Sequence, residues 1–580
     1  MTINLFLEEL QKLRESSKYA VAQGTYSNLN GFKKYLHIER EVEKKLKKII
    51  TKASQKTTAQ LLLVCGNVGD GKSHILSHLH DELKSEISQF TIHNDATESH
   101  NPHESSNQTL YKLLQGFKDE NLKTSHDKII LAINLGTLSK FIEEFGTEYT
   151  QLKEYIAFNK ILDTDVVHND DFIEASPFHH VNFTDYHLYS LTAEGAISEI
   201  ITTLFERIVA NNDANTLYKA YVSYKESLDE GLYCPILYNY EFLFNDNNRK
   251  IIAQLIIKAI IKSKEIVSLR TLLNFIYDLI VPIDLASLND NDYFKRIENF
   301  SSAEYLSNLL PNYIFEHPEL SSLFEKIERL DPCLTRNAET DEVLLSLINA
   351  SNPVPLFADH IAANYIDTIQ SRLANTLIVK STLSRFFIRL NYFSNYYDQD
   401  SLKEVDYEEY LVWLYHYNNN NPAYIQKIYG LVEVAARNWN GDAKSNGKVI
   451  INVGKKQTKY RVFKDFDPIP DLKLNPKNSD DILHKFTQEF SLAYKISQEK
   501  ESLKIHVDYS LFKTLKMVSK GYRPNKKDNN NFIYFVNAIT TLTNQNNHKA
   551  SLYIDEINIG KAVDYQFSKN PFGGYTFQVL

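Results

Sequence analysis

Two continuous apolar runs lie in the first third of the chain, with a helical pattern between them. The first is Leu61–Cys65, which is followed by a glycine. The second lies within Ile129–Leu135 and is apolar up to Asn134, whereas Ser73–Ile87 has the apolar spacing of a helix. Continuous apolar runs of this length are typical of strands buried on both faces of a parallel sheet. Because strand-like and helix-like segments alternate from about residue 60 to 190, the pattern predicts an α/β sheet built from crossover units.

The pattern changes twice farther along the chain. From about Leu191 it becomes largely helical, and Ala193–Val209 and Asn248–Lys262 are the clearest helical segments. After about residue 440, Lys448–Val453 and Thr458–Phe463 alternate like the two strands of a hairpin. We therefore expect an α/β core with a helical lid and middle region, followed by a C-terminal α+β domain. The expected domains are an N-terminal helical segment (1–54), the core with its lid (55–285), a mainly helical domain (286–435) and the α+β domain (436–580).

Composition and charge exclude several classes of protein. Hydrophobic residues make up 43% and charged residues 24% of 580 residues, which is the balance of a soluble globular protein with several domains. The formal charge of −9 argues against a general binder of polyanions, although it leaves room for local basic patches. No stretch approaches 18 uninterrupted apolar residues, so we expect neither a secretion signal nor a membrane span, and a cytoplasmic location.

A complete phosphate-binding motif follows the first apolar run. Its residues are Gly66, Asn67, Val68, Gly69, Asp70, Gly71, Lys72 and Ser73, and His74 comes next. Glycines allow the backbone N–H groups to converge on phosphate oxygens, and the following helix adds its N-terminal dipole. Lys72 supplies a positive charge for the β- and γ-phosphates, and the Ser73 hydroxyl is a ligand for Mg²⁺. The motif predicts binding of ATP with Mg²⁺ by residues 66–74 in a P-loop NTPase core.

Three polar residues are candidates for hydrolysis, although no strand ends in a plain Asp-Glu pair between Ser73 and Gly146. Asp95 is placed to act in the shell of the metal, and Glu98 to orient the attacking water. Asp95 equally suits a turn or a helix cap. Asn134 ends the second apolar run and resembles the residue that senses the γ-phosphate in AAA+ ATPases, which implies an AAA+-like core.

A second candidate contact with the γ-phosphate lies at the start of a later predicted helix. Ser268 and Arg270 precede the helical segment Thr271–Ile280. A Ser-x-Arg at this place resembles the second sensor of AAA+ lids, in which the arginine contacts the γ-phosphate. The alternative is an ordinary N-cap serine followed by a solvated arginine. Four arginines are available to reach the nucleotide of a neighbouring subunit: Arg249, Arg372, Arg385 and Arg389.

Residues that bind transition metals are scattered. The cysteines Cys65, Cys234 and Cys333 lie far apart and lack metal-ligand spacing. His93, His100 and His103 share one segment, but their spacing is loose and no cysteine or cluster of carboxylates accompanies them. The spacing does not favour a zinc site there.

Basic residues gather in two segments near the C-terminus. The first holds the predicted DNA contacts Lys513, Lys516, Lys520 and Arg523, with Tyr522 among them. The second is the predicted hairpin, with Tyr460 and the basic residues Lys455, Lys456, Lys459, Arg461 and Lys464. Lysines can neutralise phosphates and tyrosines can stack on exposed bases. The alternative is a solvated basic surface without a nucleic-acid partner.

Six segments in order along most of the chain resemble the F-component (DptF) family of DNA phosphorothioation-dependent restriction systems. They are GNVGDGKSH at 66–74, HNDATESHNP at 93–102, ILAINLG at 130–136, HHVNFTDYHLYSL at 179–191, LRTLLNFIYDLIVP at 269–282 and HVDYSLFKTLKMVSKGYRPN at 506–525. The first of these is a generic motif, whereas HNDATES and VNFTDYHLYSL are far more specific.

The resemblance implies a role in bacterial defence against foreign DNA. Such a protein works with two partners, the G and H components, against DNA whose backbone lacks sulfur. We therefore expect an ATPase component that meets DNA directly or through its complex, and a homo-oligomer is compatible with this role. No nuclease constellation is evident in the chain. The alternative is a nucleotide-bound scaffold that assembles the partners without significant turnover, as the missing Asp-Glu pair suggests.

Overall fold

The computed structural model divides the chain into two compact units. Unit 1 holds Met1–Ser190 and Ala196–Glu404, and unit 2 holds Leu191–Gly195 and Val405–Leu580. The expected division into four domains stays a prediction. The structure describes residues 3–19, 31–67, 69–93, 106–163, 171–227, 234–286, 290–356, 358, 361, 363–374, 380–441, 447–451, 459–472, 480–496, 502–545, 551–556, 564–570, 572 and 574–579.

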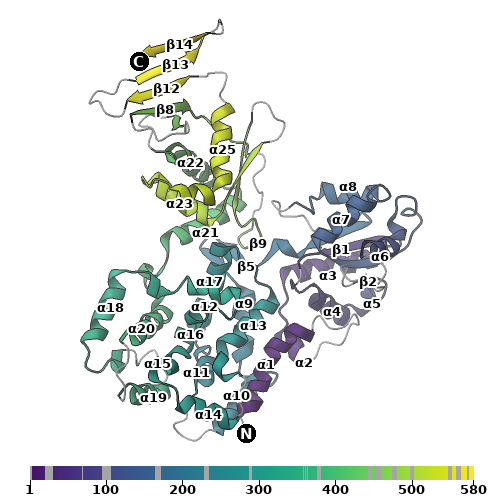
Figure 1. Ribbon diagram of the computed structural model, residues 1–580. Coiled ribbons are helices and arrows are strands. Elements are labelled where there is room, and N and C mark those ends of the chain that lie inside the picture. The colour runs from purple at the N-terminus through teal and green to yellow at the C-terminus, as the bar shows by residue number, and fades with distance from the viewer. Residues whose placement is uncertain are drawn as a thin grey trace. The chain divides into compact units, whose positions relative to one another are not determined.

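A parallel sheet forms the α/β part of unit 1 and confirms the mixed α/β class (Figure 1). Its order is β2-β3-β1-β4, so β1 is flanked by a strand on either side. The register pairs Cys65 with Ile133 of β3 and with Asn182 of β4. Loops that follow these strands therefore meet at one edge of the sheet. The strands are β1 (Gln60–Cys65), β2 (Thr91–His93), β3 (Lys128–Ile133) and β4 (Phe178–Asn182).

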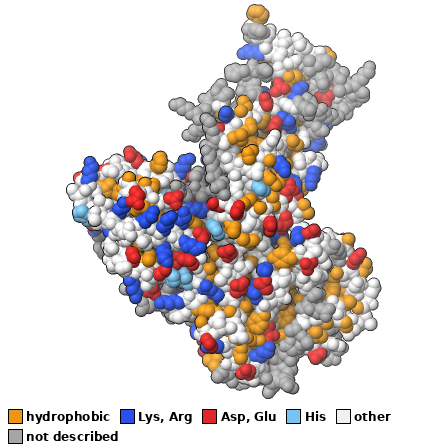
Figure 2. Space-filling view, turned by 180° about the vertical axis from the view of Figure 1, so that it is seen from behind, with side chains coloured by type: hydrophobic (Ala, Val, Ile, Leu, Met, Phe, Trp, Pro, Cys, Tyr) orange, Lys and Arg blue, Asp and Glu red, His pale blue; other side chains and the backbone are white. Residues whose placement is uncertain are grey.

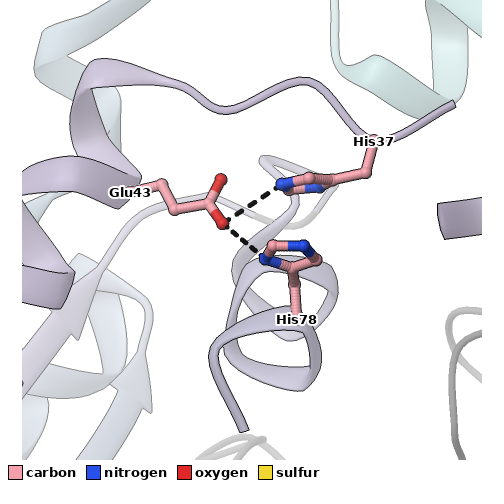
Figure 3. Close-up of side chains that lie close together, drawn as sticks. All are labelled: His37, Glu43 and His78. Carbon is pink, nitrogen blue, oxygen red and sulfur yellow. Dashed lines mark ion pairs between the residues drawn. The ribbon is translucent and has the colours of Figure 1, made fainter. Parts of the chain in front are cut away.

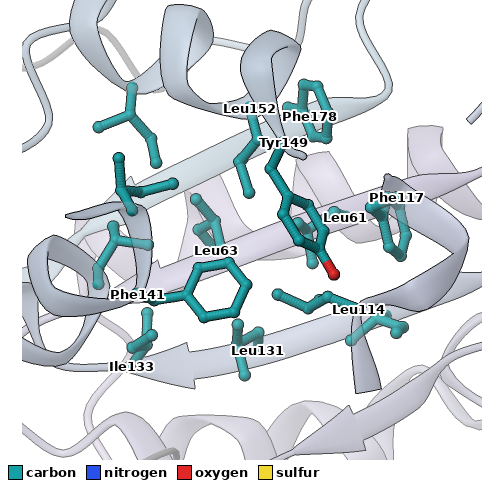
Figure 4. Packing of buried hydrophobic residues seen from close by; sticks show 14 of the residues in the cluster. Leu61, Leu63, Leu114, Phe117, Leu131, Ile133, Phe141, Tyr149, Leu152 and Phe178 are labelled. Carbon is teal, nitrogen blue, oxygen red and sulfur yellow. The ribbon is translucent and has the colours of Figure 1, made fainter. Parts of the chain in front are cut away.

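Alternate residues of the strands face two separate apolar cores. Leu61 and Leu63 of β1 pack on one face with β3 residues such as Leu131, as Figure 4 shows, and Leu62 and Val64 pack on the other face. Helices cover both faces, which explains why the central strands β1 and β3 are apolar at nearly every position. One layer is α6 (Ser106–Leu113), α7 (Leu135–Phe145) and α8 (Thr150–Phe158), and the other is α3 (Glu41–Ser54), α4 (Lys72–Glu82) and α5 (Lys84–Ile87).

The rest of unit 1 is mainly helical, as the pattern predicts. The buried apolar residues of α12 and α13 include Ile252, Leu255 and Phe275. The hairpin strands β5 (Tyr186–Thr192) and β6 (Gly195–Ile197) precede α9, and Leu191–Gly195 of this hairpin are counted with unit 2. The helices are α1 (Ile3–Tyr19), α2 (Gly31–Leu36), α9 (Glu199–Val209), α10 (Thr216–Glu226), α11 (Pro235–Phe242), α12 (Asp246–Ser263), α13 (Leu269–Ile280), α14 (Asp290–Glu298), α15 (Ser302–Ser307), α16 (Leu310–Glu316), α17 (Ser322–Glu328), α18 (Ala338–Asn349), α19 (Ala363–Ala374) and α20 (Lys380–Asn395).

Unit 2 mixes helices with an antiparallel sheet of order β14-β13-β12-β8-β7. The expected hairpin is confirmed, since β7 pairs antiparallel with β8. A separate antiparallel pair joins β10 to β11. The strands are β7 (Lys448–Ile450), β8 (Tyr460–Asp465), β9 (Leu483–Lys485), β10 (Phe490–Tyr494), β11 (Leu503–Val507), β12 (Leu552–Glu556), β13 (Asp564–Lys569) and β14 (Tyr575–Val579); the helices are α21 (Val405–Asn418), α22 (Pro422–Asn438), α23 (Tyr509–Ser519), α24 (Lys526–Asn531) and α25 (Ile533–Gln545).

Three predicted boundaries are wrong for local reasons. The second strand ends at Ile133 because the Asn134 side chain accepts from Thr137 N and starts α7. The helix expected at Ser73–Ile87 is broken at Leu83, where φ is −109° and ψ is 46°. The first part of Ala193–Val209 is the strand β6, and α9 begins only after the N-cap Ser198.

Candidate functional site

Residues 66–73, the connection from β1 to α4 together with the first two residues of α4, are called the glycine loop here. It leaves the carboxyl end of β1 next to β3, where Gly66 N donates to the carbonyl oxygen of Ile133 at 3.2 Å. Gly69 and Gly71 have φ of 91° and 88°, a left-handed conformation that L side chains rarely adopt. These two glycines therefore make the backbone of the loop curl tightly before α4 begins at Lys72. Val68 lies outside the described residues.

The Lys72 ammonium closes this loop from its own helix. Its Nζ donates to the carbonyl oxygens of Gly66 at 2.9 Å and of Asn67 at 2.6 Å. A cation beside a helix N-terminus favours an anion at the same place, because the first N–H groups of the helix have no partner within it. Ser73 is the second residue of α4, and its carbonyl oxygen accepts from the Ser77 hydroxyl at 2.8 Å.

Asp70 shapes the loop from within. Its Oδ2 accepts from Asn67 N at 2.5 Å. Burial raises the pKa of the Asp70 carboxyl, while the Asn67 amide, Lys72 and Arg40 oppose that shift. The carboxylate therefore occupies part of the loop and adds negative charge beside Lys72.

Arg40, just before α3, is a residue that the sequence analysis missed. Its side chain is buried, and Nη1 donates to the carbonyl oxygen of Asp70 at 2.9 Å. Its guanidinium carbon lies 5.9 Å from the centre of the Phe183 ring. Phe183 itself packs on the start of the loop, since a Cβ at Gly66 would lie 2.8 Å from Phe183 Cβ. No motif or periodicity marks Arg40 in the sequence.

Polar residues follow the two strands that flank β1. Asn134 comes directly after β3, and its Oδ1 caps α7 by accepting from Thr137 N at 2.7 Å. Asn182 ends β4, and its Nδ2 donates to the buried Asp185 at 3.1 Å. Asp185 also acts electrostatically on the thiol of Cys65, whose pKa burial raises to about 12. The structure thus places Asn134 and Asp185 at the edge of the sheet that carries the glycine loop.

The predicted hydrolytic residues Asp95 and Glu98 lie outside the described residues, as do His100 and His103. The strand before them, β2, ends at His93 and pairs in parallel with β3. The carboxyl end of β2 therefore lies at the same edge of the sheet as Asn134.

The start of α13 lies against the glycine loop. A Cβ at Gly69 would lie 3.2 Å from both Cβ and Oγ of Ser268, and a Cβ at Gly71 would lie 3.6 Å from Leu269 Cδ1. Ser268 is also the N-cap of α13, because its Oγ accepts from Thr271 N at 3.1 Å. The two interpretations of this segment are therefore compatible: the serine is a cap, and the helix that carries Arg270 begins beside the loop.

His74 contacts other histidines. Its Nε2 lies 3.0 Å from Nδ1 of His37, and burial, followed by the charge of His37, lowers the pKa of His74 to about 4. The neutral ring can accept a hydrogen bond from His37. Contact between His74 and a nucleotide stays a prediction.

The predicted DNA contacts differ in their surroundings. The Lys516 ammonium lies 2.8 Å from Asp406 and also pairs with Glu409, so its charge is already balanced. Lys520 and Arg523 are exposed, and Lys513 is partly buried. Figure 2 shows basic and acidic side chains interspersed over one face of the molecule. DNA contact by these residues stays a prediction; Lys455 and Lys456 lie outside the described residues.

Three of the four arginines considered for a neighbouring nucleotide have partners in their own chain, and the side chain of the fourth, Arg372, lies outside those that the structure describes. Arg249 donates to the carbonyl oxygens of Leu243 and Phe244, and Arg385 lies 3.4 Å from Glu316. Arg389 is 1% exposed and pairs with Glu316 at 2.6 Å and with Asp331 at 2.5 Å. Arg389 is therefore part of the core.

Comparison with family models, with curated proteins and with solved structures gives no match to this chain. Within the part of the chain that the structure describes, none of the helices combines the length and apolar character needed to cross a bilayer. We therefore interpret the site from its own geometry.

Proposed function

We propose that the chain binds ATP at the glycine loop and hydrolyses it with Mg²⁺, in a P-loop NTPase core of AAA+-like type whose helical lid includes α13. The observation that carries the proposal is the Lys72 ammonium, held at the N-terminus of α4 by the Gly66 and Asn67 carbonyl oxygens. A helix N-terminus, a glycine-rich turn and a lysine together form an arrangement that receives phosphate groups.

The donors at the loop fit a triphosphate and its metal. Backbone N–H groups of the loop and Lys72 would hold the phosphates, and the Ser73 hydroxyl would hold Mg²⁺. The ion would neutralise part of the phosphate charge. One feature opposes the fit, since the Asp70 carboxylate accepts from Asn67 N within the loop. A bound phosphate would therefore compete with Asp70 for that amide.

The residues around the loop supply groups for hydrolysis. Asn134 at the end of β3 is suited to hold the attacking water, and Arg270 on α13 is suited to reach the γ-phosphate. Asp95 and Glu98, which lie outside the described residues, remain the proposed metal-shell residue and base. Asp185 is a further buried carboxylate at this edge.

The decisive experiment replaces the lysine of the loop. Lys72→Ala should abolish measurable ATP binding in equilibrium dialysis and phosphate release in a steady-state assay. The matched control is Lys44→Ala, because Lys44 pairs with Glu41 at the exposed start of α3. If Lys72→Ala bound and hydrolysed ATP like the parent while Lys44→Ala did the same, the glycine loop would not be the nucleotide site.

The resemblance to the F-component family supports a more specific role. We propose that ATP turnover serves a bacterial complex that restricts DNA lacking phosphorothioate, together with the G and H components. A nucleotide-bound scaffold is the alternative, and the lack of a plain Asp-Glu pair at a strand end between Ser73 and Gly146 favours it. Turnover measured with and without both partners and unmodified DNA separates the two. A rate that they stimulate supports the ATPase role, and a rate that stays at background supports the scaffold.

A further inference from the structure

Two histidines and a glutamate from three separate segments converge on one another, as Figure 3 shows. His37 lies between α2 and α3, Glu43 is on α3 and His78 is on α4. His37 Nε2 lies 3.2 Å from Glu43 Oε1, and His78 Nδ1 lies 2.9 Å from the same oxygen. These three ligand atoms all lie within 4.8 Å of one another.

The two contacts to Glu43 are ion pairs when the histidines are protonated, but neither contact has the geometry of a hydrogen bond. Among the described residues, His37 Nε2, His78 Nδ1 and both oxygens of Glu43 have no hydrogen-bond partner, although Glu43 is only 1% exposed. Short contacts without hydrogen-bond geometry leave buried polar atoms unsatisfied, which is rare in folded proteins. A cation that accepts lone pairs from the two imidazole nitrogens and the carboxylate would satisfy these buried polar groups.

We propose that His37, Glu43 and His78 bind a divalent transition metal of the zinc class. Two imidazoles and one carboxylate are a known zinc ligand set, in which the fourth position is left to water. Ligand atoms about 2.0–2.1 Å from a tetrahedral ion stand roughly 3.3–3.4 Å apart, close to the observed 2.9 Å and 3.2 Å. The His78 side chain is 28% exposed, so the site opens to solvent on that side.

Metal binding requires one local movement. The rings of His37 and His78 are stacked, with centroids 3.7 Å apart and planes inclined by 18°. Imidazole lone pairs lie in the ring plane, so the rings must tilt apart for both to meet one ion. His78 is the more exposed ring, and its tilt is the expected change on binding.

The contact of His37 with His74 supports His37 as a metal ligand. His37 Nδ1 lies 3.0 Å from Nε2 of His74, which can accept the proton that a metal-bound ring carries on its other nitrogen. Such outer partners fix the tautomer and orientation of ligating histidines. His74 directly follows Ser73, so the ion would tie α3 and its preceding segment to the first turns of the helix that begins at the glycine loop. The proposal needs no bound nucleotide.

The test uses the full chain without a histidine tag, freed of metal by a chelator. Zn²⁺ alone is titrated in competition with a chromophoric chelator, and Mg²⁺ serves as the control ion. The parent should bind one Zn²⁺ per chain, and its unfolding temperature should rise with Zn²⁺ and stay unchanged with Mg²⁺. A parent chain that binds no stoichiometric Zn²⁺ overturns the proposal, whatever its ATPase activity.

Variants then locate the ion. Glu43→Gln and His78→Gln should weaken Zn²⁺ binding by at least about tenfold, the scale on which changes at a metal site act. His80→Gln, two positions along the same helix, should bind like the parent. Co²⁺ in the parent should give a tetrahedral spectrum without a thiolate charge-transfer band, which excludes the cysteines as ligands. Parent-like binding by both variants, or a thiolate band, would overturn the assignment even if either variant folds poorly.

Discussion

Arg40 Nη1 donates a 2.9 Å hydrogen bond to the backbone carbonyl oxygen of Asp70, in the middle of the glycine loop. The arginine lies 30 positions earlier in the sequence and is buried. Burial lowers the pKa of Arg40, while the charges of Asp70 and Glu43 oppose the shift. A buried cation is retained at a cost in solvation, so we infer that its contact with the loop matters for the shape of the loop.

Replacing Arg40 by methionine tests that inference. Arg40→Met keeps an apolar stem beside Phe183 and removes the donor to Asp70. We expect the Kd for ATP to rise by about tenfold, because a hydrogen bond to a charged group contributes about 1.5–3 kcal/mol. Lys44→Met removes a nearby exposed charge and should leave the Kd unchanged in the same titration. Equal affinities of parent and Arg40→Met would show that the loop keeps its shape without the arginine.

Gly69 tests the geometry of the glycine loop, because backbone strain and a close contact would both destabilise the loop if this residue carried a side chain. Its φ of 91° disfavours an L side chain, and an added Cβ would lie 3.2 Å from Ser268. Gly69→Ala should lower the free energy of unfolding by about 1–2 kcal/mol, the cost of the left-handed conformation, and should weaken ATP binding. Calorimetry and nucleotide titration measure the two effects.

Gly430 provides a control, because its replacement by alanine should change the free energy of unfolding in the opposite direction. It lies within α22, and apart from its chain neighbours and the backbone of its own helix no atom of the described residues comes within 4 Å of its Cβ position. Gly430→Ala should therefore stabilise the helix by about 0.5–1 kcal/mol and leave ATP binding unchanged. A destabilising effect there as large as that at Gly69 would mean that the loop geometry is not the cause.

The parallel sheet could be predicted because its signal is local. A strand covered on both faces is apolar at every position, so Leu61–Cys65 predicted β1 almost to the residue. The end of β3 was missed because Leu135 is apolar too, and only the capping bond from Asn134 marks the start of α7. The predicted helix Ala193–Val209 includes Gly195, but the φ of Gly195 is 137°, which is not helical, and the residue begins β6.

The surroundings of the loop could not be predicted for a different reason. Arg40 meets Asp70, and Ser268 meets Gly69, across gaps in sequence that leave no periodicity. The same holds for His37 and His78, which are far apart until α3 and α4 pack on one face of the sheet. Spacing rules identify ligands that share an element, and these ligands come from different ones.

Two substitutions separate the helix-capping role of Asn134 from its proposed role in hydrolysis. Asn134→Ser keeps an N-cap acceptor for Thr137 N and removes the amide donor, whereas Asn134→Ala removes both. Alanine should cost about 1 kcal/mol of stability and serine a few tenths at most. If the amide holds the attacking water, both variants should still bind ATP but hydrolyse it at least about tenfold more slowly. Parent-like turnover of Asn134→Ser would leave the residue with its capping role alone.

Arg389 should matter for stability and not for a neighbouring nucleotide. Its guanidinium meets Asp331, Glu316 and Asn312 in the core. Arg389→Met leaves two largely buried carboxylates without their partner, and we expect a loss of about 3–5 kcal/mol in denaturant unfolding. Arg329→Met removes an exposed pair with Glu325 and should cost less than about 1 kcal/mol. A loss in Arg389→Met no larger than in Arg329→Met would contradict the assignment of Arg389 to the core.

His179 should make the folded chain sensitive to acid. Its ring is 1% exposed, lies 3.0 Å from Gln60 Oε1 and stacks on Phe172. Burial, followed by the charge of Lys56, lowers the pKa of His179 to about 4 from 6.5. The unfolded chain therefore binds this proton more readily, so His179 destabilises the fold progressively as pH falls from about 6.5 toward 4 and has no such effect above 7.5.

His179→Gln should differ from the parent by a constant free energy of unfolding above pH 7.5. Below pH 6.5 the difference should shift in favour of the variant by up to about 1.4 kcal/mol per pH unit, the slope for one proton. A difference that stays constant from pH 7.5 to 4.5 would mean that His179 takes up its proton equally well in the folded chain.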